Sequence, residues 1–159
     1  MDDKLRLQDL DLLFKEEVAR EPGCGHLLRC FSCGACTATC PVSEITPEFS
    51  PSLIIRQILY GQREALLSSP ALWYCARCAR CSFQCPQDVR FLDIIQGLRS
   101  IALREGLLSG AKAELLAKGE GLIQELRARM IERILAEDGE NVDPLEILSL
   151  LIKEMDKVK

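Results

Sequence analysis

The stretch "CFSCGACTATCP" at residues 30–41 recurs in outline as "CARCARCSFQCP" at residues 75–86. Each copy holds four cysteines in the spacing CxxCxxCxxxC, and a proline follows the last of them. All five shared positions are offset by 45 residues, as from 30 to 75. This internal repeat predicts a pseudo-twofold unit in which the two copies have the same task.

Length, charge and hydropathy exclude several classes of protein. The chain has 159 residues, about one domain. Its N-terminus, "MDDKLRLQDLDLLFKEE", carries charges where a signal peptide needs a continuous apolar stretch, and no run approaches the roughly 18 apolar residues of a membrane span. The net charge of −4, with both signs interleaved, gives no basic face for nucleic acid. We expect a cytoplasmic protein without a transmembrane segment, in a compartment where structural disulfides are rare.

The cysteine spacing favours iron-sulfur clusters over the other uses of grouped cysteines. A structural zinc site usually combines two separate CxxC units, whereas here three consecutive steps crowd four thiolates into eleven residues. A tight CxxCxxC turn can present three thiolates to three iron corners of a cube, and in two-cluster ferredoxins the fourth cysteine closes the other cluster. A zinc-binding interaction module and a thiol-disulfide catalyst stay open as alternatives.

This arrangement predicts two [4Fe-4S] clusters with crossed fourth ligands. The predicted ligands, which are also the predicted metal-binding residues, are Cys30, Cys33, Cys36 and Cys85 for the first cluster, and Cys75, Cys78, Cys81 and Cys40 for the second. Pro41 and Pro86 lack a backbone N–H and fix the local turn, which lets the preceding cysteine leave its own loop.

Residues beside the motifs receive structural interpretations. Cys24 is the one cysteine of the nine outside the two motifs, and His26 is the only histidine. Both are expected to have structural roles. Aromatic residues in or before the motifs are expected to pack over the clusters and exclude water: Phe31, Trp73, Tyr74 and Phe83. Four arginines could raise the cluster potentials or serve as surface charges: Arg29, Arg77, Arg80 and Arg90.

The rest of the pattern predicts helices and no sheet. Apolar residues recur at helical spacing over residues 9–20, and Ser50, Pro51 and Gly61 bound a helix over 51–60. Asp88 is expected to cap a further helix that ends at Gly106. Residues 107–159 lack cysteine and predict a helical hairpin, with "EDGENVDP" as its loop before a last helix begun by Asp143 and Pro144.

Three segments follow from this pattern. We expect residues 1–22 to form an N-terminal amphipathic helix, residues 23–106 a two-cluster α-helical domain, and residues 107–159 a helical extension. The stretch "LEILSLLIKEM" in the extension has an apolar arc too wide for a small domain to cover, so we expect the extension to dock on a partner protein.

The motifs also resemble a known family. "LLRCFSCGACTATCPV", "SPSLIIRQILYG", "LWYCARCARCSFQCPQDV" and "RFLDIIQGLRSIALREG" are similar to the C subunit of heterodisulfide reductase, and more broadly to the α-helical ferredoxin domain of succinate dehydrogenase and fumarate reductase iron-sulfur proteins. The resemblance covers roughly residues 9–106 and implies an all-α ferredoxin domain with two [4Fe-4S] clusters. Residues 107–159 match no part of that family.

The resemblance also implies a function. The chain would be a non-catalytic component of a heterodisulfide reductase-type complex. It would relay electrons from the flavin-containing subunit of the complex to the catalytic subunit, whose CCG domains carry the catalytic cluster. No catalytic residue comes with the motifs, and the chain has no CCG pair of its own. A freely diffusing dicluster ferredoxin is the main alternative function, and co-purification with a partner would separate the two.

Overall fold

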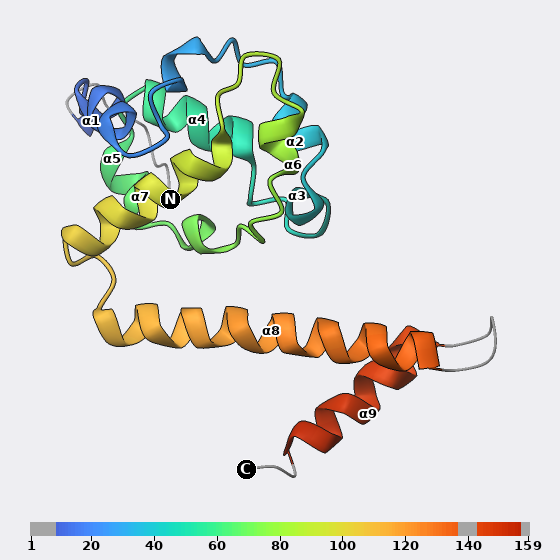
Figure 1. The fold of residues 1–159 in the computed structure, drawn as a ribbon. Helices are drawn as coiled ribbons and strands as arrows, with labels where there is room; N and C mark the ends of the chain where they lie inside the picture. Colours follow the sequence, from blue (N-terminus) through green and yellow to red (C-terminus); the bar gives the residue numbers. More distant parts are fainter. Residues whose placement is uncertain (1–8, 137–142, 157–159) are drawn as a thin grey trace. The chain divides into compact units, whose positions relative to one another are not determined.

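The fold is built from helices alone in the part of the chain that the structure describes. A computed structural model describes residues 9–136 and 143–156, with side chains up to residue 153, and all regular elements in these ranges are helices. The predicted all-α class is confirmed. The chain forms two compact units that divide between Leu108 and Ser109 (Figure 1).

The first unit contains both cysteine motifs, and its elements are short. They are α1 (Phe14–Arg20), η2 (Leu27–Arg29), α2 (Ala35–Ala38), α3 (Pro41–Ile45), α4 (Pro51–Leu59), α5 (Arg63–Leu67), η3 (Pro70–Trp73), α6 (Arg80–Phe83) and α7 (Phe91–Arg104), where η marks a 3-10 helix. The helices α2 and α6 lie within the motifs, contact each other and have the same 45-residue offset as the cysteines.

Helix α4 has the boundaries that its sequence predicts. The Ser50 hydroxyl oxygen accepts a hydrogen bond from the backbone N–H of Leu53 at 3.4 Å, and Pro51 occupies the first helical position. The helix ends before Gly61, whose φ of +75° an L side chain rarely adopts. Serine at the cap and glycine after the end therefore fix both ends of α4.

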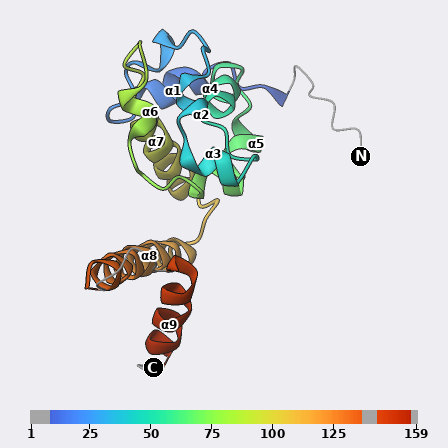
Figure 2. The ribbon, with the colours of Figure 1, turned by 90° about the vertical axis from the view of Figure 1, so that its right-hand side faces the viewer.

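Helix α7 is the centre of the first unit. It contacts α1, α5, α6 and η3 and buries one face against the core (Figures 1 and 2). Its buried residues are Phe91, Ile94, Ile95, Gly97, Leu98, Ile101 and Ala102. Gly106, with φ +72°, follows the end of the helix as predicted. The face of α7 thus supplies much of the core that holds the cysteine loops in place.

Two predicted helix starts are wrong. The helix predicted over 9–20 begins only at Phe14, because the Asp11 carboxylate accepts a hydrogen bond from the N–H of Leu13 at 2.9 Å in a preceding turn. Asp88 does not cap α7, which begins at Phe91 without a side-chain cap. Asp88 and Arg90 have φ of 49° and 56°, and this left-handed backbone separates Asp88 from the helix.

The N-terminal helix packs into the same unit as the cysteine motifs. Phe14 of α1 is fully buried, and the Arg63 guanidinium lies 5.2 Å from the centre of its ring. Arg63 also pairs with Glu17 of α1 and with Glu105 after α7, and these hydrogen bonds raise its pKa. The cation joins three segments that are distant in sequence, so it stabilises the tertiary arrangement around α1.

The second unit is a helical hairpin made of α8 (Gly110–Ala136) and α9 (Pro144–Asp156), which contact each other. Asp143 and Pro144 begin α9 as predicted, with the Asp143 carboxylate accepting from the N–H of Leu145 at 2.9 Å. Ile147 and Leu151 are its buried residues among those described. The predicted loop at 137–142 and the side chain of Met155 lie outside the described part.

Hydropathy along the helices bears on membrane insertion. Within residues 9–136 and 143–156, none of the helices combines the length and the apolar character that a membrane crossing requires.

Candidate metal centre

The two cysteine loops follow the same backbone path. In each loop the second and fourth residues after the first cysteine have positive φ: 57° at Ser32 and 80° at Gly34, then 56° at Arg77 and 60° at Ala79. For a residue other than glycine this conformation costs on the order of 1–3 kcal/mol and persists only where its surroundings enforce it. Left-handed residues turn successive backbone N–H groups into one concavity, a geometry that many iron-sulfur sites use.

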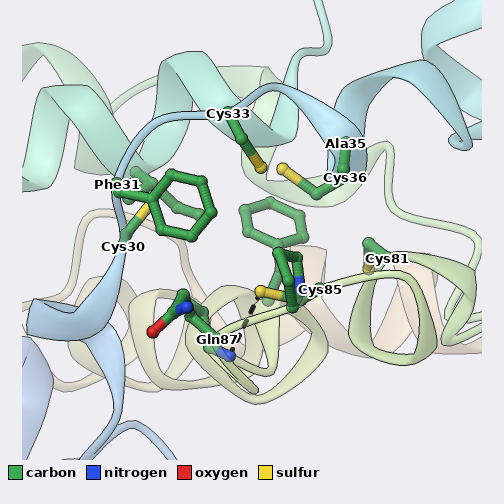
Figure 3. A pocket seen from close by; sticks show the side chains of 12 residues that line it. Cys30, Phe31, Cys33, Ala35, Cys36, Cys81, Cys85 and Gln87 are labelled. Carbon is green, nitrogen blue, oxygen red and sulfur yellow. Dashed lines mark hydrogen bonds between the residues drawn. The ribbon is translucent and has the colours of Figure 1, made fainter.

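The first cavity lies among the cysteines of both motifs. Cys30, Cys33 and Cys36 line it from the first loop, and Cys85 lines it from the end of the second motif. Figure 3 shows the sulfur atoms of Cys33, Cys36 and Cys85 directed toward the enclosed space from different sides. The fourth cysteine of the second motif therefore belongs to the cavity of the first loop.

The second cavity has the reciprocal composition. Cys75 and Cys78 line it from the second loop, and Cys40 lines it from the end of the first motif. Cys81 lines both cavities. Apart from the cysteines, apolar residues line the second cavity. The lining of the first cavity is also apolar except for the amide side chain of Gln87. The fourth cysteine of each motif is thus exchanged between the two cavities.

A single buried aromatic residue separates the cavities. Phe91, the first residue of α7, lines both, and its side chain is 2% exposed. Its ring meets the ring of Phe49 edge to face, with centroids 6.3 Å apart. Phe91 therefore forms a buried apolar wall that the two cavities share.

Local hydrogen bonds hold individual sulfur atoms. The backbone N–H of Ser32 donates to Cys30 Sγ at 3.4 Å. The backbone N–H of Val89 donates to Cys85 Sγ at 3.4 Å, the dashed line in Figure 3. Such N–H donors stabilise negative charge on a thiolate and influence the potential of a bound cluster. Pro41 starts α3 directly after Cys40, so the expected use of proline at this turn agrees with the fold.

A hydroxyl network fixes the first loop to the start of α4. The Thr37 hydroxyl donates to Ser52 Oγ at 2.8 Å, and the Ser52 backbone N–H donates to Thr37 Oγ1 at 2.9 Å. Because Thr37 follows Cys36 directly, these bonds orient the loop against α4. Sequence reasoning missed this contact, since the two hydroxyl residues are 15 positions apart.

Burial affects the protonation of the cysteines in both cavities. Burial is the largest cause that raises the pKa of Cys36, Cys75 and Cys81, in the last case to about 11. The thiols are therefore protonated near neutral pH, whereas a metal binds the thiolate. Loading the cavities with metal would release protons, so the apparent affinity for metal rises with pH.

The cysteines of each cavity are spread around its rim and do not converge on one metal-ion position. Among the residues that the structure describes, no three His, Cys, Asp or Glu side chains group as tightly as a single metal ion needs. Soft thiolate ligands around an apolar-lined space suit a cluster of iron and sulfur atoms, in which each cysteine binds a different corner. The residues present therefore fit [4Fe-4S] clusters.

Cys24 lies apart from both cavities. Its side chain is fully buried in the core, and a Cβ at Gly97 would lie 3.1 Å from its sulfur. Burial, followed by the charges of Asp93 and Glu21, raises the pKa of the Cys24 thiol to about 11. His26 also stays outside the cavities, with Nδ1 2.9 Å from the backbone oxygen of Asp88. Both residues have the structural surroundings expected of them.

The raised pKa of Cys24 predicts a loss of stability at alkaline pH. In the unfolded chain a thiol titrates near about 8.5, so above that pH the unfolded state has lost a proton that the folded state keeps until about pH 11. The contribution of Cys24 to the free energy of unfolding is therefore fully present below about pH 8.5. It is lost as the pH rises from there to about 11, by up to about 3 kcal/mol. Thermal unfolding at pH 7.5 and 10, compared with Cys24→Ala, checks this expectation. Equal falls in both proteins would contradict it.

Arg99 of α7 contacts the segment that enters the second loop. Its Nε donates to the backbone oxygen of Leu72 at 2.7 Å, and its Nη2 donates to that of Cys75 at 3.4 Å. The guanidinium lies 5.2 Å from the ring centre of Trp73. The sequence singles out the four arginines near the motifs but not Arg99, which is distant in sequence and lies within an apolar helical pattern.

The aromatic side chains only partly follow their expected role. Phe31 lines the first cavity, while Trp73 packs against the core and Arg99 and lines neither cavity. Phe83 is 91% exposed, so the expectation that it covers a cluster is wrong. Phe83, at the end of α6, points outward. Phe91 is the buried aromatic residue that lines both cavities instead.

Comparison with known proteins identifies the class. Residues 26–89 match the 4Fe-4S dicluster domain, so the first unit is an iron-sulfur domain. Clusters of this type are held by cysteine thiolates and carry electrons in oxidoreductases. The predicted iron-sulfur ferredoxin class is therefore confirmed.

The chain is also similar to C subunits of heterodisulfide reductases. The chain is 34% identical over 107 residues to the C subunit of the H(2):CoB-CoM heterodisulfide,ferredoxin reductase of Methanothermobacter thermautotrophicus, covering 67% of this chain and 57% of the relative. It is 38% identical over 103 residues to the C subunit of the ferredoxin:CoB-CoM heterodisulfide reductase of Methanosarcina acetivorans, covering 65% and 41%. The chain is a homologue of these heterodisulfide reductase C subunits and spans roughly half their length.

Proposed function

We propose that this protein binds two [4Fe-4S] clusters with exchanged fourth ligands. The first is held by Cys30, Cys33, Cys36 and Cys85, and the second by Cys75, Cys78, Cys81 and Cys40. The observation that carries this proposal is that Cys85 lines the cavity of the first loop while Cys40 lines that of the second. Each cluster would supply one-electron redox chemistry, and the loops would hold it and exclude water.

The clusters serve as a relay between two other proteins of a complex. Cys33 of the first loop and Cys78 of the second are both exposed, so each cavity has a cysteine at the protein surface where an electron can enter or leave. The relatives are components of heterodisulfide reductases. By analogy, the donor is the flavin-containing subunit and the acceptor is the catalytic subunit with CCG domains. The reducing cytoplasm is the compartment that suits such thiolate sites.

Metal analysis tests this function. Anaerobically purified protein is expected to contain about eight iron and eight sulfide per chain, and its broad visible absorption is expected to bleach with dithionite. A colourless protein with zinc would instead identify an interaction module. Stoichiometric co-purification with flavin-containing and CCG-containing chains supports the fixed subunit, whereas isolation without any partner favours a freely diffusing ferredoxin.

The C-terminal extension, residues 107–159, serves as the docking element in this proposal. α8 buries none of its residues among those described, although several are large and apolar. Its most exposed apolar side chains are Leu115 at 66%, Ile123 at 63% and Leu135 at 80%. The two helices expose more apolar side chains than their contact with each other uses. Such a surface is suited to being covered by another protein of the complex.

Charged substitutions on α8 are expected to separate the complex without affecting the clusters. Ile123→Glu combined with Leu135→Glu places a carboxylate at two exposed apolar positions, so partner binding should weaken at least about tenfold through loss of apolar burial. Co-purification and the visible spectrum report binding and cluster content. Gln124→Glu is the matched control, because it adds a charge at an exposed polar position of the same helix. Full assembly of the double variant would contradict the docking role.

A further inference from the structure

The two halves of the cluster domain differ in one partly buried cation. The Ile-Ile pairs of α4 and α7, residues 54–55 and 94–95, align the helices with an offset of 40 residues. This register places Leu59 of α4 at the position that Arg99 occupies in α7. Arg99 donates to the backbone oxygens of Leu72 and Cys75, whereas Leu59 offers an apolar side chain. One half therefore has a fixed guanidinium beside the first cysteine of its loop, and the other half has an alkyl group.

The loops extend the same asymmetry of charge. Arg77 and Arg80 lie in the second loop at the positions that Ser32 and Ala35 occupy in the first. Arg77 and Arg80 are both exposed, so solvent screens their charges strongly. Arg99 is half-buried and held by backbone oxygens, which weakens screening and makes its charge the more effective one at short range.

The contacts of Arg99 also prevent it from moving away. Two of its N–H groups are bonded to backbone oxygens at 2.7 and 3.4 Å, and its guanidinium lies over the ring of Trp73. Both backbone oxygens belong to the segment that enters the second loop, so the cation keeps its position relative to Cys75. A fixed positive charge near a redox centre stabilises the more negative, reduced state and therefore raises the reduction potential.

We propose that Arg99 raises the reduction potential of the cluster at Cys75, Cys78, Cys81 and Cys40 above that of the cluster at Cys30, Cys33, Cys36 and Cys85. This inference rests on the proposed function. When the protein takes up a single electron, that electron resides on the second cluster. Transfer from the first cluster to the second is then the favourable direction within the chain.

A redox titration with dithionite, followed by electron paramagnetic resonance, tests the assignment on the full chain. Arg99→Met removes the charge but keeps an unbranched side chain, and the higher of the two midpoint potentials should fall. The expected fall corresponds to at least a tenfold change in the partition of one electron between the clusters, which is about 59 mV. Arg99→Lys keeps the charge and should retain most of the higher potential, which a purely structural role would not predict.

Two further variants make the result specific. Arg56→Met removes an exposed guanidinium from α4 and should leave the difference between the potentials unchanged. Cys78→Ser alters one ligand of the second cluster and should change the signal that has the higher potential. Equal shifts of both potentials in Arg99→Met, or a change of the lower-potential signal in Cys78→Ser, would overturn the inference. Protein without two clusters, as shown by its iron content, would instead refute the proposed function.

Discussion

Replacement of Cys40 by alanine is expected to damage the cluster of the second loop, 35 residues or more further along the chain, and to spare the cluster of its own loop. Cys40 lines the cavity of Cys75 and Cys78, so its loss leaves one iron corner without a thiolate. The protein should lose iron from one site only.

Alkylation identifies which cluster is lost. Under anaerobic conditions without denaturant, a thiol reagent reacts with free cysteines and not with iron-bound ones, and mass spectrometry locates the labels. In Cys40→Ala the labels should appear mainly on Cys75, Cys78 and Cys81. The reciprocal variant Cys85→Ala should direct them to the first loop, while Cys24→Ala should change neither pattern. Labels on the three cysteines of the first loop in Cys40→Ala would show that each motif forms its own site.

The second large effect concerns the wall between the cavities. Phe91→Ala is expected to destabilise the protein by about 3–5 kcal/mol, the usual range for removal of a fully buried aromatic side chain. It should also admit water to both groups of sulfur atoms, because Phe91 lines both cavities. Thermal unfolding and the rate of cluster bleaching in air measure the two consequences.

Phe83→Ala provides the matched control for this experiment. It removes the same side chain from a position that is 91% exposed, so the change in stability should stay within about 0.5 kcal/mol. Clusters of Phe83→Ala should bleach at the wild-type rate, and those of Phe91→Ala severalfold faster. Equal bleaching in the two variants would exclude Phe91 as a shared barrier.

The sequence is most informative where a residue type has one physical use. Four cysteines at fixed spacing followed by proline predict a cluster loop, and Ser50, Pro51 and Gly61 set the ends of α4 because each satisfies or removes a backbone group locally. These features depend on neighbours within a few residues. They can therefore be read from one segment without the rest of the chain.

Sequence reasoning fails where the backbone conformation or a partner distant in sequence determines the position or contacts of a residue. Aspartate is a common helix-capping residue, so the sequence predicts that Asp88 caps α7. The positive φ of Asp88 and Arg90 instead moves the start of α7 to Phe91. The role of Phe91 as a shared wall depends on both loops, and the contacts of Arg99 reach 24 and 27 residues back along the chain. No local signal encodes such contacts, so they emerge only from the fold.

One measurement tests the central claim most directly. Crystals of the anaerobically purified protein, with diffraction recorded at the iron absorption edge, would locate the iron atoms and their cysteine ligands. The account predicts two four-iron sites, with Cys85 bound to the site of Cys30, Cys33 and Cys36, and Cys40 bound to the other. A structure in which Cys40 completes the site of its own loop would contradict the exchanged ligation.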